Sequence, residues 1–365
     1  MDKPRSSDGP VTLAHVAERA GVSQMTASRA LNGRTGVSAK TRREVVRIAT
    51  QLGYRVNVAA RKLSNGRSRI IAVLAPDLTN QFIGQLLIGA GEAARKVDYE
   101  MLVYTLFDEN RRSHDDMLRL LQQFADGLIA ILPRGATDYV QALYAASMPI
   151  VVLDHRGEVA ALPTIASNHY EGASIAMRHL LELGHSRIGF LTGPDEPGAC
   201  ADRLTAYQHV LAQHGLRVDP QLISAGDYTQ RGGFEAARRL LSLRKRPTAI
   251  FAVNDMAAFG ALDAIKDAGL SVPHDISLIG FDDIPMASQT HPPLTTIRQP
   301  LVWMGRSAVN TLLAQINGID VASPRVTLPT ELVVRASTAP PQNGGRVLPS
   351  AGARGAKPSA QGCEL

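Results

Sequence analysis

Residues 12–33 read TLAHVAERAGVSQMTASRALNG, and this stretch decides the fold of the amino-terminal part of the chain. Thr12 can cap a first helix, because the apolar residues that follow it recur at helical spacing. Gly21 then interrupts the pattern, and Ser23 can cap a second helix from Gln24 to Asn32. Two short helices joined through a glycine turn predict a helix-turn-helix.

The second of these helices carries polar side chains where a helix-turn-helix reads DNA. In such a motif the N-terminal residues of the second helix enter the major groove, and here they are Gln24, Met25 and Thr26. The alternative is an ordinary helical hairpin within a larger core. A dense set of hydrogen-bonding side chains on one face disfavours that alternative. The set comprises Gln24, Ser28, Arg29 and Asn32. The stretch therefore predicts binding to double-stranded DNA.

The charge of the chain is unevenly distributed. Residues 1–69 hold 14 Lys and Arg against 4 Asp and Glu, whereas the rest of the chain holds 25 against 29. A compact basic segment on a mildly acidic body is typical of a phosphate-binding module. A membrane-binding tail is the rival interpretation. The segment lacks a hydrophobic run and a strongly amphipathic Trp or Phe face, so we favour nucleic acid.

The next segment predicts a third helix and then a basic hinge. Ser38 can cap a helix whose apolar residues fall on one stripe. Residues 55–69 read RVNVAARKLSNGRSR, in which Asn57 can cap a short helix from Val58 to Leu63. Such a helix is too short to be stable alone in water. A helix that folds only against DNA and inserts Leu63 between minor-groove base steps would explain the basic composition of this segment. A frayed tether is the competing interpretation on composition alone.

Cysteine usage and hydropathy bound the compartment. The two cysteines, Cys200 and Cys363, cannot form a disulfide framework, and no residue spacing is typical of a metal site. The chain has neither the apolar segment of a secretion signal nor a run of 18 apolar residues. We therefore expect a cytoplasmic protein without a metal or another cofactor.

From residue 70 onward, short apolar runs alternate with amphipathic helical patterns. Near-continuous apolar strands separated by helices predict parallel sheets that are covered on both faces. The alternation is long enough for two doubly wound sheets in series. The expected strands lie at residues 70–75, 101–105, 127–132, 150–153, 164–166, 187–192, 249–253 and 277–281.

Polar and aromatic residues follow the predicted strands. Ligands of open parallel sheets bind beyond the carboxyl ends of the strands. Loops are polar in any case, but Asp and Asn beside Arg and Tyr are suited to a polyhydroxylated ligand. Carboxylates and amides pair with hydroxyls, and an aromatic ring stacks on a sugar. The strand exits include Pro76-Asp77, Asp154-His155-Arg156, Asp227-Tyr228, Asn254-Asp255 and Asp282-Asp283.

The ordered set of motifs resembles that of the LacI/GalR family of bacterial transcription repressors over about residues 11–338. In the amino-terminal part the resemblance rests on TLAHVAERAGVSQMTASRALNG, VSAKTRREV, LGY and NVAARKLSNG. In the body it rests on IAVLAPDLTNQF, ADGLIAILP, IVVLDHR, LLELGHSRIGFLTGP, ADRLTAYQHVL, PTAIFAVND, GLSVPHDISLIGFDD and PPLTTIRQP. It implies an all-α helix-turn-helix head, a hinge helix and a two-lobed α/β core similar to periplasmic sugar-binding proteins.

The resemblance also implies residue roles in DNA binding. Thr12 and Ser28 would hold phosphates, and Gln24 and Met25 would face base edges. Arg29 would reach a base or the backbone, and Leu63 would be the minor-groove wedge. The complete implied DNA-binding set is Thr12, Ser23, Gln24, Met25, Thr26, Ser28, Arg29, Asn32, Asn57, Ala60 and Leu63.

A second implied set would bind the effector. Arg203, Asn254 and Asp282 match positions that clasp it, and Tyr228 matches an aromatic residue that stacks on it. The complete implied effector-binding set is Asp77, Asp154, Arg203, Tyr228, Asn254 and Asp282. The chain also departs from the family. Where many members read Asp-Asn-x-x-Gly, it reads Asn168-His169-Tyr170-Glu171-Gly172.

The expected organisation has four parts. They are a DNA-binding domain at 1–56, a hinge helix and linker at 57–69, a two-lobed effector-binding and dimerisation domain at 70–338, and a disordered tail at 339–365. Family members that form tetramers do so through leucine heptads, which this tail lacks, so we expect a homodimer. The helix from Gly84 to Lys96 is a candidate dimer contact, and its glycines indicate close helix packing rather than a nucleotide loop.

The predicted function is repression of transcription under the control of a small effector, a sugar or sugar derivative. Because a two-fold dimer presents two heads, the operator should be an imperfect palindrome. A purine-like co-repressor is the alternative ligand for the same fold. The basic head disfavours a solute-binding transport protein, and the absence of G-x-S-x-G, P-loop and H-E-x-x-H motifs disfavours an enzyme.

Overall fold

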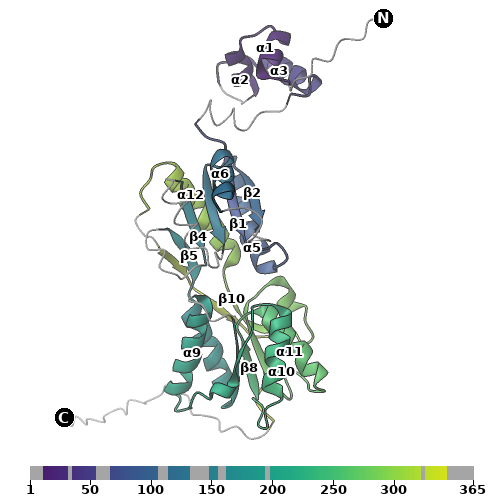
Figure 1. The fold of residues 1–365 in the computed structure, drawn as a ribbon, viewed down its shortest axis with the longest axis vertical. Coiled ribbons are helices and arrows are strands. Elements are labelled where there is room, and N and C mark those ends of the chain that lie inside the picture. The colour runs from purple at the N-terminus through teal and green to yellow at the C-terminus, as the bar shows by residue number, and fades with distance from the viewer. Residues whose placement is uncertain are drawn as a thin grey trace, which may run out of the picture. The chain divides into compact units, whose positions relative to one another are not determined.

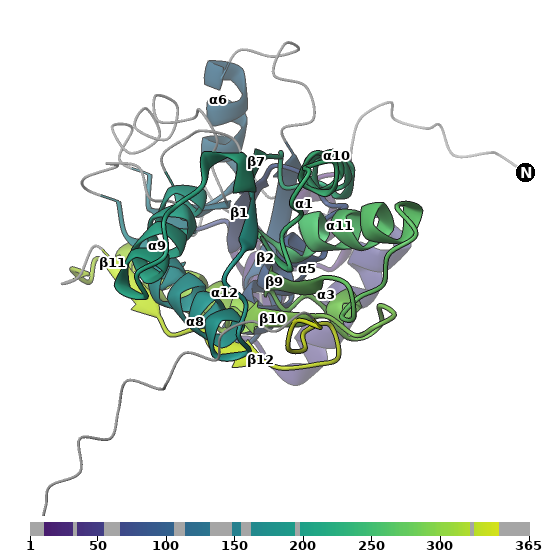
Figure 2. The same ribbon diagram turned by 90° about the horizontal axis from the view of Figure 1, so that it is seen from below.

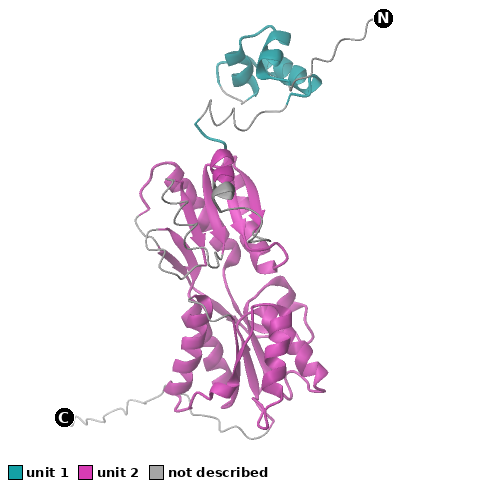
Figure 3. Cartoon of the chain, in the orientation of Figure 1, with its two compact units in different colours: residues 1–68 teal, residues 69–365 magenta. Residues whose placement is uncertain are grey.

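In the computed structural model the chain forms two compact units, residues 1–68 and residues 69–365 (Figure 3). The structure describes residues 11–31, 35–54, 66–105, 114–131, 148–154, 162–193, 198–321 and 325–342, with only the backbone of 114–118 (Figure 1). None of the helices in these ranges is both long and apolar enough to cross a membrane.

The first unit is a bundle of three helices, α1 (Leu13–Arg19), α2 (Gln24–Leu31) and α3 (Ala39–Gln51). The predicted caps of the last two are confirmed. The backbone N–H of Thr26 donates to Ser23 Oγ at 3.1 Å, and that of Thr41 donates to Ser38 Oγ at 3.1 Å. Small and branched apolar residues hold the bundle together, because one stripe of each helix is buried. They include Val16, Ala17, Ala27, Ala30, Val45, Ile48 and Ala49.

The second unit contains two six-stranded sheets. The strands of each sheet, counted along the chain, follow the same spatial order in both sheets. The first sheet has the order β11-β5-β4-β3-β1-β2 and is parallel throughout. The second has the order β12-β10-β9-β8-β6-β7, in which only β12 is antiparallel to its neighbour. The first sheet comprises β1 (Ile70–Ala75), β2 (Glu100–Thr105), β3 (Gly127–Ile131), β4 (Ile150–Leu153), β5 (Thr164–Ser167) and β11 (Arg325–Leu328). The second comprises β6 (Ile188–Thr192), β7 (Ile223–Ala225), β8 (Ala249–Ala252), β9 (Ser277–Asp282), β10 (Thr295–Arg298) and β12 (Glu331–Val333).

Helices cover both faces of each sheet, as predicted for strands that are apolar throughout. In the second lobe, α8 and α9 lie on one side of the sheet and α10 and α11 on the other (Figure 2). The helices of the first lobe are α5 (Gln81–Arg95), α6 (His114–Phe124) and α12 (Leu301–Ile316). Those of the second are α8 (His169–Glu182), α9 (Ala199–Gln213), α10 (Gln230–Leu241) and α11 (Asp255–Asp267), with the short turns η1 (Pro220–Leu222) and η2 (Pro285–Ser288).

The chain crosses between the lobes three times, which differs from the prediction of two sheets in series. The first crossing joins β5 to α8. The second joins β10 to α12, which returns to the first lobe and packs on α5. The third joins β11 to β12. The first lobe is therefore completed by chain that has already passed through the second, and all three crossings lie at the level where the two sheets face each other (Figure 1).

Glycines allow the closest helix contact in the first lobe. A Cβ on Gly89 of α5 would overlap the backbone carbonyl of Val302 on α12, and a Cβ on Gly305 of α12 would overlap the carbonyl of Leu86. The predicted role in close helix packing is thus confirmed for Gly89. It is wrong for Gly84, whose Cβ would meet no atom within 4 Å.

The carboxyl-terminal segment is tied to the second lobe beyond the predicted boundary at residue 338. The Ala339 N–H donates to Ser277 Oγ at 3.0 Å, and its carbonyl accepts from His185 Nε2 at 2.9 Å. Burial lowers the pKa of His185. The ring of His185 also lies 2.9 Å from Thr248 Oγ1 through Nδ1, so it ties this segment to the strands of the second lobe.

Candidate effector and DNA-binding sites

In the first unit, the residues that are predicted to read DNA bases lie on α2. Gln24, Met25 and Arg29 are exposed, and the side chain of Met25 is 65% accessible. An exposed methionine at the start of a helix is unusual for a structural residue, because its apolar surface contributes nothing to the core. The hydroxyls of Ser23 and Thr26 lie 2.9 Å apart and bond to each other.

The structure says less about the remaining residues of the predicted DNA-binding set. Thr12 is at the N-cap of α1, where its own N–H donates to His15 Nδ1 at 3.3 Å. Ser28 is partly buried on α2. Four members lie outside the described residues, namely Asn32, Asn57, Ala60 and Leu63.

Three of the six predicted effector-binding residues come together in the second unit. Asp154 follows β4, Arg203 lies on α9, and Asp282 ends β9. All three are almost fully buried, at 6%, 3% and 5% exposure respectively. Buried charges need partners, since transferring an unpaired ion out of water is very costly. The arrangement of those partners therefore defines the site.

Arg203 lies at the centre of this cluster. Its Nη1 donates to the Val253 carbonyl, and its Nη2 lies 3.9 Å from Asp282 Oδ1. The guanidinium carbon is 3.7 Å from the centre of the Phe281 ring, which is a cation–π contact. Its Nε is buried and has no hydrogen-bond partner among the described residues. A buried donor without a partner costs about 1–3 kcal/mol, so this atom is suited to an acceptor on a ligand.

Asp282 forms a hydrogen bond with a residue of the second crossing between the lobes. Gln299 Nε2 donates to Asp282 Oδ1 at 2.6 Å, and Gln299 in turn accepts from Ser167 Oγ at the end of β5. Burial raises the pKa of the Asp282 carboxyl to about 7, although Arg203 and the Gln299 hydrogen bond act in the opposite direction. Sequence reasoning missed Gln299 and Ser167, which link two of the three crossings.

His169 is a further member of the cluster that was not predicted as a site residue. It is fully buried at the start of α8 and lies 2.6 Å from Asp154 through Nε2 and 3.1 Å from Arg203 through Nδ1. The only signal for it in the sequence was the departure from the family pattern at residues 168–172.

The other three predicted effector residues make hydrogen bonds or ring contacts away from the three buried charged residues. Asp77 accepts from the N–H groups of Thr79 and Asn80 at 2.8 and 3.0 Å and so shapes its own turn. Asn254 caps α11 and donates to the Tyr228 carbonyl at 3.1 Å. Tyr228 packs its ring on Gly193, where a Cβ would overlap the ring.

Comparisons with known proteins show which family has this architecture. Residues 12–57 match the model for bacterial regulatory proteins of the lacI family, and residues 177–338 match a periplasmic binding protein-like domain. The HTH-type transcriptional repressor CytR of Escherichia coli (strain K12) is 34% identical over 336 residues, which is 92% of this chain and 98% of CytR. The chain belongs to the LacI family.

Solved structures agree with this assignment. The lac repressor dimer bound to operator and the anti-inducer ONPF has a TM-score of 0.77 and 31% identity, over 91% of this chain and all of that one. The complex of the transcriptional regulator CelR with cellobiose has a TM-score of 0.69 and 30% identity, over 90% of this chain and 99% of that one. This LacI-family chain therefore has the predicted helix-turn-helix head and two-lobed α/β core.

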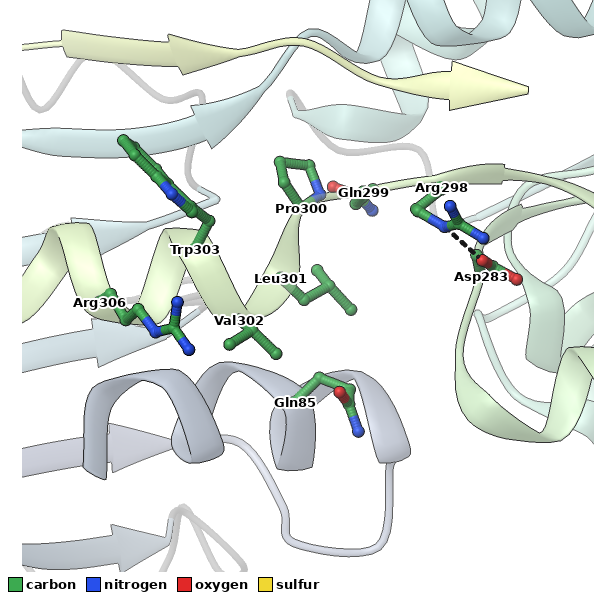
Figure 4. A pocket seen from close by; sticks show the side chains of 9 residues that line it. All are labelled: Gln85, Asp283, Arg298, Gln299, Pro300, Leu301, Val302, Trp303 and Arg306. Atoms are coloured by element: carbon green, nitrogen blue, oxygen red, sulfur yellow. Dashed lines mark hydrogen bonds and ion pairs between the residues drawn. The ribbon is translucent and has the colours of Figure 1, made fainter. Parts of the chain in front are cut away.

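A cavity of about 340 Å³ lies beside the second crossing of this LacI-family core (Figure 4). Gln85 of α5, Gln299 and Trp303 of α12 line the cavity. Gln299 also donates a hydrogen bond to Asp282, so one wall of the cavity is formed by a partner of Asp282. Arg298 lies at the far end and bonds to Asp283 at 2.7 Å. Trp303 is the only tryptophan of the chain and is 56% exposed.

Asp282 gives the LacI-family core a testable pH dependence. Its pKa is about 7 when folded, against an ordinary 3.8, so the folded state holds a proton that the unfolded state has released. The contribution of Asp282 to stability is therefore present below pH 4, falls as the pH rises toward 7, and is lost above that. We expect the free energy of unfolding of the wild type, relative to Asp282→Asn, to decrease by up to about 1.4 kcal/mol per pH unit in this window. Urea unfolding of both proteins from pH 4 to pH 8 measures it, and parallel curves would contradict it.

Proposed function

We propose that this LacI-family protein represses transcription as a homodimer on a palindromic operator, and that a sugar or sugar derivative bound at a buried charged cluster of the second unit controls operator affinity. The observation that carries the ligand part is the buried cluster of Arg203, Asp282 and Asp154 at the carboxyl ends of strands from both lobes. Open parallel sheets bind ligands at that edge. The proposal places the protein in the cytoplasm with its operator.

The chemistry of the cluster supports a hydroxyl-rich ligand. Arg203 Nε has a free donor among the described residues, and the buried Asp282 carboxyl can accept from a hydroxyl. A sugar offers a donor and an acceptor on neighbouring carbons, so one ligand can pair with both groups. The CelR structure contains cellobiose, and that relative is 30% identical to this chain.

The surfaces of both units support the DNA and dimer parts. Gln24, Met25 and Arg29 are exposed on α2, where a recognition helix contacts bases. In the first lobe, apolar side chains on and around α5 and β2 are exposed, as a surface that pairs with a second copy would be. They are Leu78, Ile88, Val97 and Leu102. The lac repressor relative was solved as a dimer on its operator.

The decisive experiment selects operators from random duplexes with the full-length protein. We expect an imperfect palindrome, bound in preference to its scrambled version, with affinity changed by one member of a panel of ribose, galactose, cellobiose and adenosine. Adenosine tests the purine-like alternative. The same compounds are followed for turnover, which we expect to be absent. No preference for any palindrome, with or without these compounds, would overturn the proposal.

The affinity for the selected operator should fall steeply with salt. The 14 Lys and Arg among residues 1–69 compete with counterions at DNA phosphates, so binding releases those ions. We expect a loss of roughly a thousandfold or more between 50 and 200 mM salt. Fluorescence anisotropy at several salt concentrations measures the slope, and a flat double-logarithmic plot would contradict binding dominated by phosphates.

A further inference from the structure

His169 joins the two lobes within the candidate effector site. It is the first residue of α8 in the second lobe, and its partner Asp154 follows β4 of the first lobe. The Nε2–Oδ1 distance is 2.6 Å, and both side chains are almost fully buried, at 0% and 3% exposure. The pair therefore connects the lobes beside the first crossing.

The contacts of the ring fix its protonation. Arg203 carries only donors, so His169 Nδ1, at 3.1 Å from Arg203 Nη2, must be the acceptor in that bond. The hydrogen of a neutral imidazole is then on Nε2, which donates to the Asp154 carboxylate. A protonated ring would turn a second donor toward the guanidinium and lose this bond. The geometry thus requires a neutral imidazole in the Nε2–H tautomer.

The chain Asp154–His169–Arg203 restricts the guanidinium from one side. On the other sides it is restricted by the Val253 carbonyl, the Phe281 ring and Asp282. Only Nε is left without a partner among the described residues. Rotation of the arginine would break several of these contacts at once, so the free Nε is held in one orientation.

We propose that His169 is a positioning residue of the effector site, which orients Arg203 for the ligand from an anchor in the first lobe. The proposal rests on the proposed effector site and adds a residue that sets its affinity. Because His169 spans the lobes, it also makes the orientation of Arg203 depend on how the lobes are placed. Ligand binding at Arg203 and lobe position are thereby coupled.

Variants separate positioning from folding. His169→Phe removes both ring nitrogens, and His169→Gln keeps one donor and one acceptor that do not titrate. Binding of ribose, cellobiose and adenosine to each full-length protein is measured by calorimetry. We expect His169→Phe to bind the compound with an affinity at least about tenfold lower than that of the wild type. His169→Gln should recover much of this lost affinity. The control is His209→Gln, because His209 is an exposed histidine of the same lobe.

A folding defect in His169→Phe is handled by a compensating change. Asp154→Gly combined with His169→Phe removes the carboxylate that the single variant leaves unpaired, and glycine is unstrained at the Asp154 φ of +58°. A folded variant of either kind that binds the compound as tightly as the wild type would overturn the proposal.

A spectroscopic readout does not depend on the ligand. Nitrogen-15 NMR of the histidine rings, with His169→Gln for assignment, should show an N–H signal at Nε2 and an unprotonated Nδ1 at neutral pH. An imidazolium or the opposite tautomer would overturn the positioning role of His169. If the wild type binds none of the three compounds, the carbohydrate and purine forms of the proposed function fail, and the tautomer still decides the proposal on His169.

Discussion

Arg203→Ala is expected to abolish the effector response. The substitution removes the Nε that has no partner in the described part of the chain, the cation 3.9 Å from Asp282 and the contact with the Phe281 ring. A hydrogen bond to a charged group is worth about 1.5–3 kcal/mol, so effector affinity should fall roughly ten- to a hundredfold or more. Calorimetry with the compound that changes operator affinity gives the first measurement, and anisotropy on the selected operator gives the second.

The control for this result is Arg178→Ala. Arg178 lies on α8 of the same lobe, but its side chain is 42% exposed and pairs with Glu171 at 2.6 Å. Exposed ion pairs contribute about 0–1 kcal/mol, so this variant should respond like the wild type. If Arg203→Ala loses operator binding and effector response together, the cause is misfolding. If it retains a normal response, Arg203 is not part of the effector site.

Two alanine substitutions on one helix should change stability in opposite directions. Gly89 and Gly84 both lie on α5, where alanine is favoured over glycine by about 1 kcal/mol. At Gly89 the added methyl would overlap the backbone of Val302, which cannot move aside as a side chain can. We expect Gly89→Ala to lower the free energy of unfolding by about 1–3 kcal/mol in spite of its helix propensity.

Gly84→Ala is the matched variant, because its Cβ has open space. We expect it to raise the free energy of unfolding by about 0.5–1 kcal/mol. Urea unfolding of the full-length proteins measures both changes. Equal shifts in one direction would mean that helix propensity, and not the contact between α5 and α12, controls stability at these positions.

Much of the fold follows from local pattern. The caps Ser23 and Ser38 and the strands at 70–75 and 150–153 were predicted because short-range chemistry determines them. The strands β7, β10, β11 and β12 were missed. They are three or four residues long, and three of them (β7, β11 and β12) are edge strands, so their pairing depends on distant parts of the chain rather than on their own sequence.

The site was predicted in part for the same reason. Asp154, Arg203 and Asp282 could be placed because they follow strands or match a family motif. His169, Gln299 and Ser167 could not, because what makes them important is contact across 15 to 132 residues of sequence. Periodicity carries no information about such pairs. Asn32, Asn57, Ala60 and Leu63 stay predictions for the DNA interface.

The return of the chain to the first lobe has a consequence for synthesis. During translation, residues 70–167 emerge without α12 and β11, so the face of the first sheet that α12 covers has no partner when the second lobe begins to emerge. The first lobe therefore cannot complete its sheet and its helical cover until residue 328 has left the ribosome. A premature stop after Gln299 would release a chain in which the second lobe has most of its sheet and the first lobe cannot be completed.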